Sequence, residues 1–310
     1  MATDWHEQFK RWAKPPSDTE ETKGSNAADM IRSAIRSSSK LKDRNVEVYA
    51  TGSYANNTNI RLSSDIDVAI VLRDALYYQL PDGVSAAEVG LTGTATYLYD
   101  EFREDVGAAL RAKFGAGVKP EKKTFTIREN DHRLNADATA FLEHRRYTTK
   151  DHRGVWQYLE GVELRPRQAP SIRIQNWHRQ HYAAGVAKND RTGRRFKRVS
   201  RILKNLRDAM SNDGTAAARA AAAATPSFLI ECLVFNAPDD KFNLVDGSYY
   251  EDVKAVVACL WHRTKPDAEG KKYVEVSGLK WLFQGPQPWT MAQANDFLIQ
   301  AWYQVGFKND

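Results

Sequence analysis

The strongest constraint in this sequence is a Gly-Ser pair followed, at a set distance, by two aspartates at the start of an apolar segment. Gly52 and Ser53 end a short alternating stretch, and Asp65 stands twelve residues after the serine, with Asp67 two further on. The run 65–72 turns wholly apolar, as a buried strand does. Side chains two apart on a strand point to the same face, so the two carboxylates project together. They repel each other unless a cation lies between them, and the spacing therefore predicts a metal site.

The residues around this pair suit a nucleoside triphosphate and its metal. Mg²⁺ is held through a few carboxylates plus the phosphate oxygens of a substrate. Gly52 permits a tight turn, and Ser53 offers a hydroxyl and backbone N–H groups to a phosphate. An isolated D-x-D pair is usually a surface or capping feature, but the whole pattern of turn, gap and apolar strand is more specific. We expect a site for two Mg²⁺ ions, for which Mn²⁺ is an alternative.

A third carboxylate would complete a two-metal site, and Asp137 is the leading candidate. It stands on the strand predicted over 135–141, where burial of an unpaired acid is costly. The metal that it shares would activate the attacking hydroxyl. A buried ion pair with an arginine such as Arg145 is the alternative explanation. We expect Asp65, Asp67 and Asp137 to be the catalytic metal ligands.

The order of predicted elements indicates an α/β or α+β catalytic half followed by a mainly helical part. A Ser-x-x-Glu capping box at Ser17 predicts a helix over 18–38. The other elements expected before residue 150 are strands at 46–50, 65–72, 122–128 and 135–141 and a helix at 96–114. We place a catalytic core in 1–170 and a helical lobe in 171–310, with the active site in the cleft between them. Candidate linkers are 148–153 and the alanine-rich run 215–224, which also suits a helix or packed loop.

Composition narrows the class of protein and of partner. The net charge of +6 favours polyanionic partners such as nucleotides or nucleic acid. No apolar run approaches the roughly 20 residues that span a bilayer, and the polar N-terminus is unlike a signal peptide. The two cysteines, Cys232 and Cys259, are too few for a zinc cluster and are expected to be reduced thiols. We therefore expect a cytoplasmic protein without a membrane partner.

The stretch 52–60 together with 65–68 resembles the nucleotidyltransferase signature of the CD-NTases. These are bacterial relatives of cyclic GMP-AMP synthase and oligoadenylate synthase that act in anti-phage (CBASS) defence. Segments 181–189, 201–205 and 226–236 resemble the family in the same order, and the details look nearest to clade E. The resemblance implies an α+β fold with a polymerase-beta-like nucleotidyltransferase core. It also implies a cyclic dinucleotide product that reaches a downstream effector; cyclisation follows from the resemblance alone.

A basic helix is expected to supply charge to the substrate. Eight of the seventeen residues in 191–207 are Lys or Arg, and Lys197, Arg201 and Lys204 share one face of the helix predicted over 196–210. A solvated basic face is the ordinary interpretation of this pattern. The resemblance implies that Lys204 neutralises the triphosphate.

A second anion site is predicted at the start of a later helix. Thr225 and Pro226 look like an N-cap and a first helical residue. Ser227 would then lie in the first turn, where free N–H groups and the helix dipole favour an anion. In related synthases a serine binds phosphate and the next aromatic residue lies against a base, which implies these roles for Ser227 and Phe228. Core packing is the alternative for Phe228.

Base selection is assigned to Asn176 by resemblance to pyrimidine-using clade E enzymes. Its amide can pair with N3–H and O4 of uracil, or with cytosine when flipped. A helix cap is the alternative for Asn176, and a slip of one residue would move the role to Gln175. The expected substrates are nucleoside triphosphates, UTP and ATP in particular.

Two other functions remain open on the sequence. One is a template-independent RNA or tRNA nucleotidyltransferase, or an oligoadenylate synthase-like enzyme, because the basic segment 191–207 could hold RNA. The other is a non-catalytic nucleotide-binding relative, against which the three carboxylates count. We expect a monomer, with a nucleic-acid activator as an option.

Overall fold

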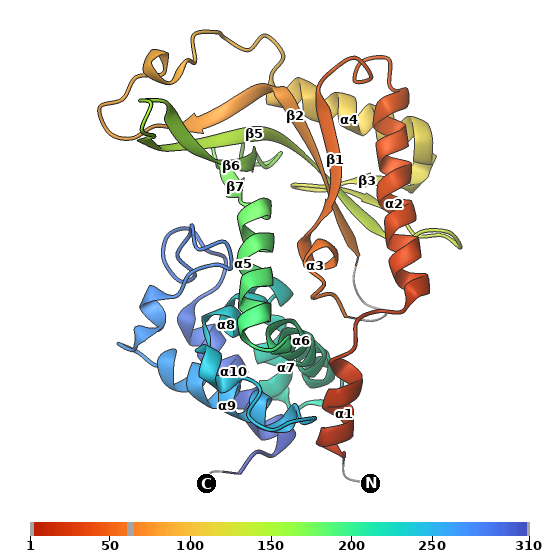
Figure 1. The fold of residues 1–310 in the computed structure, drawn as a ribbon. Helices are drawn as coiled ribbons and strands as arrows, with labels where there is room; N and C mark the ends of the chain where they lie inside the picture. Colours follow the sequence, from red (N-terminus) through yellow and green to blue (C-terminus); the bar gives the residue numbers. More distant parts are fainter. Residues whose placement is uncertain (1–2, 61–64, 309–310) are drawn as a thin grey trace. The chain divides into compact units, whose positions relative to one another are not determined.

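The computed structural model describes residues 3–60 and 65–308 of the chain (Figure 1). Its α-helices are α1 (Trp5–Trp12), α2 (Asp18–Ser37), α3 (Gly52–Ala55), α4 (Tyr99–Phe114), α5 (His178–Arg191), α6 (Arg195–Asp213), α7 (Ala216–Ala223), α8 (Ser227–Asn236), α9 (Tyr250–Arg263) and α10 (Met291–Val305). Its strands are β1 (Val46–Thr51), β2 (Ile66–Gln79), β3 (Val118–Pro120), β4 (Phe125–Ile127), β5 (Ala136–Lys150), β6 (Trp156–Leu164) and β7 (Ile174–Asn176).

The chain forms two compact units that interleave along the sequence. The sheet unit comprises the described residues of 17–55 and 64–179. The helical unit comprises the described residues of 1–16, 56–63 and 180–310. The sequence suggested a single division near residue 170, whereas α1 and the short segment after α3 group with the C-terminal helices.

The sheet unit is built on a mixed sheet in the order β1-β2-β5-β4-β3, with β6 paired to β5 and β7 paired to β6 (Figure 1). The central pair β2 and β5 is parallel, and the other pairs are antiparallel. The apolar run of β2 is fully buried because it lies between two paired strands and under helices. Thr51, Asp67 and Asp137 stand in one row across β1, β2 and β5.

One face of this sheet packs against α2 and α4. Their buried side chains join the alternate residues of β2 and β5 in a single core, which includes Ile31, Ile35, Phe102, Val106, Leu110, Ile66, Val68, Ile70, Ala138 and Ala140. Because strand side chains alternate, the remaining residues of these strands point to the other face. We call this the polar face; its members include Glu47, Tyr49, Asp67, Asp137 and Glu143.

Local signals predicted the main elements of the sheet unit well. The capping box at Ser17 is present, with Glu20 closing it, and α2 follows as expected. Strand β5 is longer than predicted and contains the first part of the supposed linker 148–153, which is a hairpin leading to β6. Strands β6 and β7 were missed, since β7 is only three residues long and gains its strand character from pairing with β6.

The helical unit has its own core around α6. Val199, Ile202, Leu203, Leu206 and Met210 are all buried there, as their helical spacing predicted. They pack with side chains of α7, α8, α9 and α10. The alanine-rich run forms helix α7, which confirms the helical alternative over a linker.

Two further sequence expectations concern cysteines and membranes. Cys232 and Cys259 are free thiols, and burial raises the pKa of each. Within the described residues no single helix has the length and apolar character to cross a membrane, while α7 and α8, a pair bent by 87°, meet that test together on length and composition alone.

Candidate active site

The sheet unit brings the three predicted acids together at the ends of adjacent strands. Asp65 directly precedes β2 and is exposed, Ile66 is buried and Asp67 is exposed, which is the alternation expected of a strand with one covered face. Asp137 of β5 is the parallel partner of Asp67. Neighbouring strands lie about 4.8 Å apart, so these two side chains leave the same face side by side.

The charges of these acids affect one another. Although Asp65 keeps exposed surface, partial desolvation of its carboxyl raises its pKa, and the nearby charge of Asp137 raises it further. The Thr126 hydroxyl donates a hydrogen bond of 2.7 Å to Oδ1 of Asp137. Arg145 instead pairs with Glu143 at 2.5 Å, so it is not the partner of Asp137. Carboxylates that raise one another's pKa in this way create a charge repulsion that a divalent cation relieves.

The acids are aligned by the backbone without being drawn to a common point. In the part of the chain that the structure describes, no group of three His, Cys, Asp or Glu side chains closes around a position for a metal ion. The donor set still fits Mg²⁺, which takes oxygen ligands and usually binds through one or two carboxylates together with substrate phosphates. The role of the three aspartates as metal ligands stays a prediction.

Two features of the structure require glycine at position 52. Its φ of +62° falls in the left-handed region, which residues with a side chain rarely adopt. A Cβ added there would lie 2.1 Å from Oδ2 of Asp67, a distance that no side chain tolerates. The predicted tight turn at Gly52 therefore also leaves space for the Asp67 carboxylate. Ser53 follows Gly52 in the short helix α3.

Lys204 does not fit the phosphate-binding role implied by the resemblance. Its side chain is only 2% exposed. Its ammonium group donates to the Thr58 carbonyl at 3.0 Å, to the Thr58 hydroxyl at 3.1 Å and to Glu231 at 2.8 Å. An ammonium group has three N–H donors, so all are used within the protein. The solvated basic face is wrong as well, because Arg201 on the same face is also buried.

The cation that does contact Ser227 is Arg207, one helical turn after Lys204. Its Nη1 donates to the Ser227 hydroxyl oxygen at 2.7 Å. Helix α8 begins at Ser227 with Pro226 in the capping position, and the Thr225 hydroxyl donates to the Ala221 carbonyl, so Thr225 is not the N-cap. Sequence reasoning passed over Arg207 because the basic stretch holds many equivalent cations, and spacing does not tell which one faces α8.

Phe228 is partly exposed rather than a core residue. Its side chain is 38% exposed. Its ring centroid lies 5.9 Å from those of both His181 and Trp289, which flank it. An aromatic ring held by neighbours while keeping accessible surface suits contact with a base better than core packing does.

The structure separates Asn176 from its neighbour Gln175. The Gln175 amide donates to Glu163 at 3.4 Å, and the two residues pair across β7 and β6. Asn176 pairs with Val162 on the opposite face, and no hydrogen bond of its side chain is found among the described residues. It lies two residues before α5, so the capping alternative does not apply. Asn176 therefore remains the better candidate for base recognition.

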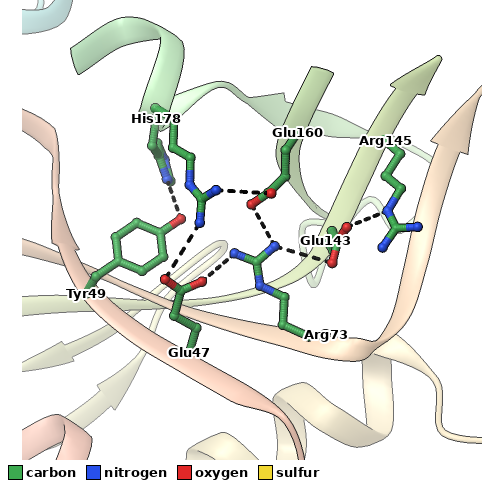
Figure 2. A network of polar contacts seen from close by, with 8 residues as sticks. Glu47, Tyr49, Arg73, Glu143, Arg145, Glu160 and His178 are labelled. Atoms are coloured by element: carbon green, nitrogen blue, oxygen red, sulfur yellow. Dashed lines mark hydrogen bonds and ion pairs between the residues drawn. The ribbon is translucent and has the colours of Figure 1, made fainter. Parts of the chain in front are cut away.

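A network of charged side chains lies on the polar face of the sheet (Figure 2). Arg73 is its centre and bonds to Glu47, Glu143 and Glu160. The first residues of α5 join it: Arg179 pairs with Glu160 at 3.1 Å, and Nδ1 of His178 lies 3.2 Å from the Tyr49 hydroxyl. Burial raises the pKa of Tyr49 to about 12. No motif predicted this network, because its members come from four strands and a helix.

The sequence matches two families over most of its length. Residues 29–147 match the nucleotidyltransferase domain, and residues 183–306 match the C-terminal helical domain of cGAS/DncV-like nucleotidyltransferases. The first range contains the three aspartates, and the second contains Arg207, Ser227 and Phe228.

Relatives and solved structures agree with these matches. The chain is 37% identical to a cyclic dipyrimidine nucleotide synthase, CdnE, of Cecembia lonarensis, covering 99% of this chain and 100% of that one. It is 35% identical to a protein of the same name from Legionella pneumophila, over 98% and 99%. The structure of the Rhodothermus marinus CdnE c-UMP-AMP synthase superposes with a TM-score of 0.81 at 28% identity, covering 98% of each chain.

Proposed function

This chain belongs to the cGAS/DncV-like nucleotidyltransferases, and from that premise we propose that it joins two nucleoside triphosphates into a cyclic dinucleotide containing at least one pyrimidine. The observation that carries the proposal is the row formed by Asp67 and Asp137 on adjacent parallel strands, with Asp65 beside them and Gly52 against Asp67. A protein that only bound nucleotides would have little use for three acids held at one strand end.

The transfer step follows from these residues. Asp65, Asp67 and Asp137 would hold Mg²⁺, which supplies charge neutralisation for the triphosphate and lowers the pKa of the attacking hydroxyl. Thr126 keeps Asp137 oriented through its hydrogen bond, and Gly52 leaves room for the Asp67 carboxylate. Phosphoryl transfer depends mainly on such positioning and on neutralisation of charge.

Ser227 and Arg207 form the anion site of the helical unit. The hydroxyl lies in the first turn of α8, where unpaired N–H groups and the helix dipole favour negative charge. Arg207 adds a guanidinium whose Nε and Nη2 donate to the neighbouring Asp208 and whose Nη1 donates to Ser227. A guanidinium has five N–H donors in a planar arrangement that matches phosphate oxygens, so three bonds leave it capacity for phosphate. We assign these two residues, in place of Lys204, to phosphate oxygens of the substrate, and Phe228 to the face of a base.

Asn176 is proposed to select the pyrimidine. Its amide is not used within the described part of the protein, whereas the neighbouring Gln175 is held by Glu163. Loss of one such hydrogen bond costs about 1 kcal/mol, or roughly a factor of ten at most. We expect Asn176→Ala to lower uridine incorporation relative to adenosine about fivefold to tenfold, and Gln175→Ala to change this ratio little.

Product analysis tests the function as a whole. Purified protein is incubated with all four triphosphates and Mg²⁺, treated with phosphatase, and the products are identified by mass spectrometry. We expect a phosphatase-resistant cyclic dinucleotide with uridine, and none without a divalent cation. A ladder of linear products would instead identify an RNA nucleotidyltransferase, and purine-only products would remove the role of Asn176.

A matched pair of variants tests the metal assignment. Asp67→Asn removes one carboxylate charge of the row, and we expect no product. Asp74→Asn changes an aspartate of the same strand whose contacts are Arg44 and the Asn45 backbone, so we expect normal turnover. Product formation by Asp67→Asn at the wild-type rate would contradict the assignment.

The setting of the reaction follows the family resemblance. We propose that the protein acts in the cytoplasm and that its cyclic product is read by a separate effector in anti-phage defence. The product analysis by mass spectrometry does not depend on this cellular setting, because the product is identified in vitro.

A further inference from the structure

Helix α6 presents two buried cations to one short stretch of backbone. Lys204 donates to the carbonyl and hydroxyl of Thr58. Arg201 donates to the carbonyl of Asn57 at 2.6 Å and to its side-chain oxygen at 3.2 Å. The same guanidinium also holds the Ala13 carbonyl through two bonds of 2.9 and 2.7 Å. All these residues belong to the helical unit.

Most of this stretch is buried without being part of a helix or strand, and exposed Asn57 stands at its start. Thr58, Asn59 and Ile60 are each at most 5% exposed, and they have no secondary structure. Asn57 adopts a positive φ of 52°, a conformation that costs free energy unless its surroundings hold it. The buried Thr58 carbonyl lies outside a ladder and must be hydrogen-bonded by something else, and here the donor is the charged Lys204. At Asn57 the charged donor Arg201 holds a backbone with positive φ.

The charge of Lys204 is balanced by a second buried group. Glu231 of α8 accepts from Lys204 at 2.8 Å, from the Thr58 hydroxyl at 2.5 Å and lies 2.9 Å from Nε2 of His181. Burial opposes ionisation of Glu231, but the charges of Lys204 and His181 hold its pKa well below the usual range. Lys204, Thr58, Glu231 and His181 thus form one group of mutual hydrogen bonds and ion pairs. Within it, the ammonium group of Lys204 has no donor left for a phosphate.

Arg201 has no carboxylate partner among the described residues. In the described structure its guanidinium donates to carbonyl and amide oxygens, and burial lowers its pKa to about 10. A buried cation is costly, so a position that keeps one for contact with two backbone carbonyls is fixing those carbonyls in place.

The position of this stretch in the chain gives the contacts a functional meaning. It follows α3, which contains Gly52 and Ser53, and it precedes Asp65 and Asp67. Ala55 belongs to the sheet unit, the described residues 56–60 belong to the helical unit, and Asp65 belongs to the sheet unit again. The described part of the connection between the Gly-Ser turn and the Asp-Ile-Asp strand therefore belongs to the helical unit.

We propose that Lys204 and Arg201 are positioning residues for nucleotidyl transfer, which act by fixing the backbone at Asn57 and Thr58 between the Gly-Ser turn and the metal-binding aspartates. The effect on turnover rests on the proposed function, whereas the grip on the backbone does not. Loss of these backbone hydrogen bonds lowers kcat and leaves the affinity for nucleotide unchanged. Loss of a phosphate ligand would instead weaken the affinity for nucleotide.

The test removes the cation without leaving a buried charge behind. Lys204→Met alone strands the Glu231 carboxylate and is expected to lower the melting temperature strongly. The double variant Lys204→Met, Glu231→Gln keeps similar volumes and no net buried charge, and is expected to recover most of this loss. Lys197→Met is the matched control, because this lysine lies on the same helix and contacts neither Asn57 nor Thr58 in the described structure.

Three measurements are made on the full-length double variant, on Arg201→Lys and on the control. Hydrogen exchange of peptides covering 56–60 reports the backbone, the Kd for α,β-methylene-ATP with Mg²⁺ reports nucleotide binding, and kcat reports turnover. For the double variant we expect exchange at least tenfold faster in 56–60, kcat reduced tenfold or more, and Kd within twofold of the wild type. Arg201→Lys keeps the charge and is expected to retain part of the protection.

The outcomes separate the two proposals. Unchanged exchange in 56–60, or a Kd weakened tenfold with that exchange unchanged, overturns the positioning role. Faster exchange with unchanged kcat overturns it too. If the wild type makes no product, the proposed function fails, and the exchange of 56–60 still decides whether these cations hold the backbone.

Discussion

Gly52→Ala is the substitution whose effect can be worked out most directly from the structure. The backbone at Gly52 has φ of +62°, and an L-residue in this region costs about 1–2 kcal/mol. For a protein of this size that cost lowers the melting temperature by roughly 2–4 °C per kcal/mol. We therefore expect a folded protein with a modest loss of stability.

The loss of activity should be much larger than the loss of stability. The new Cβ would lie 2.1 Å from Oδ2 of Asp67, and ordinary contact begins at 3.4 Å, so the carboxylate must move by more than an ångström. A displacement of about 1 Å in a catalytic site costs on the order of 100-fold in rate, or about 2.7 kcal/mol. We expect kcat/KM for cyclic product formation to fall by at least this factor.

Gly154→Ala is the matched control. Gly154 has φ of +78°, in the same left-handed region, but no atom lies within 4 Å of an added Cβ. It should lose similar stability and keep its turnover. Thermal unfolding measures the stability of both variants, and steady-state product assays measure their turnover. Turnover of Gly52→Ala within threefold of the wild type would refute the reasoning. An equal loss of turnover in Gly154→Ala would refute it as well.

Three further predictions concern the site and its scaffold. Thr126→Val removes the hydrogen bond to Asp137, worth about 1 kcal/mol, and should raise the Mg²⁺ concentration needed for half-maximal turnover about fivefold with little change in melting temperature. Ser17→Ala removes the α2 cap and should cost about 1 kcal/mol of unfolding free energy in denaturant titrations while leaving turnover unchanged; loss of turnover would show that α2 does more than support the sheet. The pKa of Asp65 is raised, so its protonated form persists to higher pH than an ordinary aspartate and Mg²⁺ binding weakens sooner as pH falls; the acid limb of kcat/KM should move to lower pH when Mg²⁺ is increased, and an acid limb independent of Mg²⁺ would contradict this.

The local pattern around Gly52 and Asp67 could be interpreted without a structure because its chemistry lies in neighbouring residues. A glycine that allows a positive φ, a serine after it and aspartates two apart on an apolar strand are all properties of short range. The same is true of the Ser17 cap and of the buried spacing on α6. Asp137 was found from the cost of an acid on an apolar strand, but its pairing with Asp67 is a matter of parallel strand register.

The contacts of Lys204 argue against its predicted phosphate role, and the sequence could not show them for a related reason. Helical spacing shows that Lys204 and Arg201 share a face, but it does not show what that face touches. Whether such a cation is solvated, bound to substrate or buried depends on the groups that tertiary packing brings to it, here Thr58 and Glu231. The contact of Arg207 with Ser227 was hidden in the same way.

By itself the sequence predicted most of the longer helices and strands, the turn at Gly52 and the shared face of Asp65 and Asp67, because backbone propensities and side-chain alternation act over a few residues. Only the tertiary structure decided which strands are neighbours and which cations are buried. Both depend on residues far along the chain, and a buried charge such as Lys204 is stable only where the folded protein supplies partners that offset its loss of hydration.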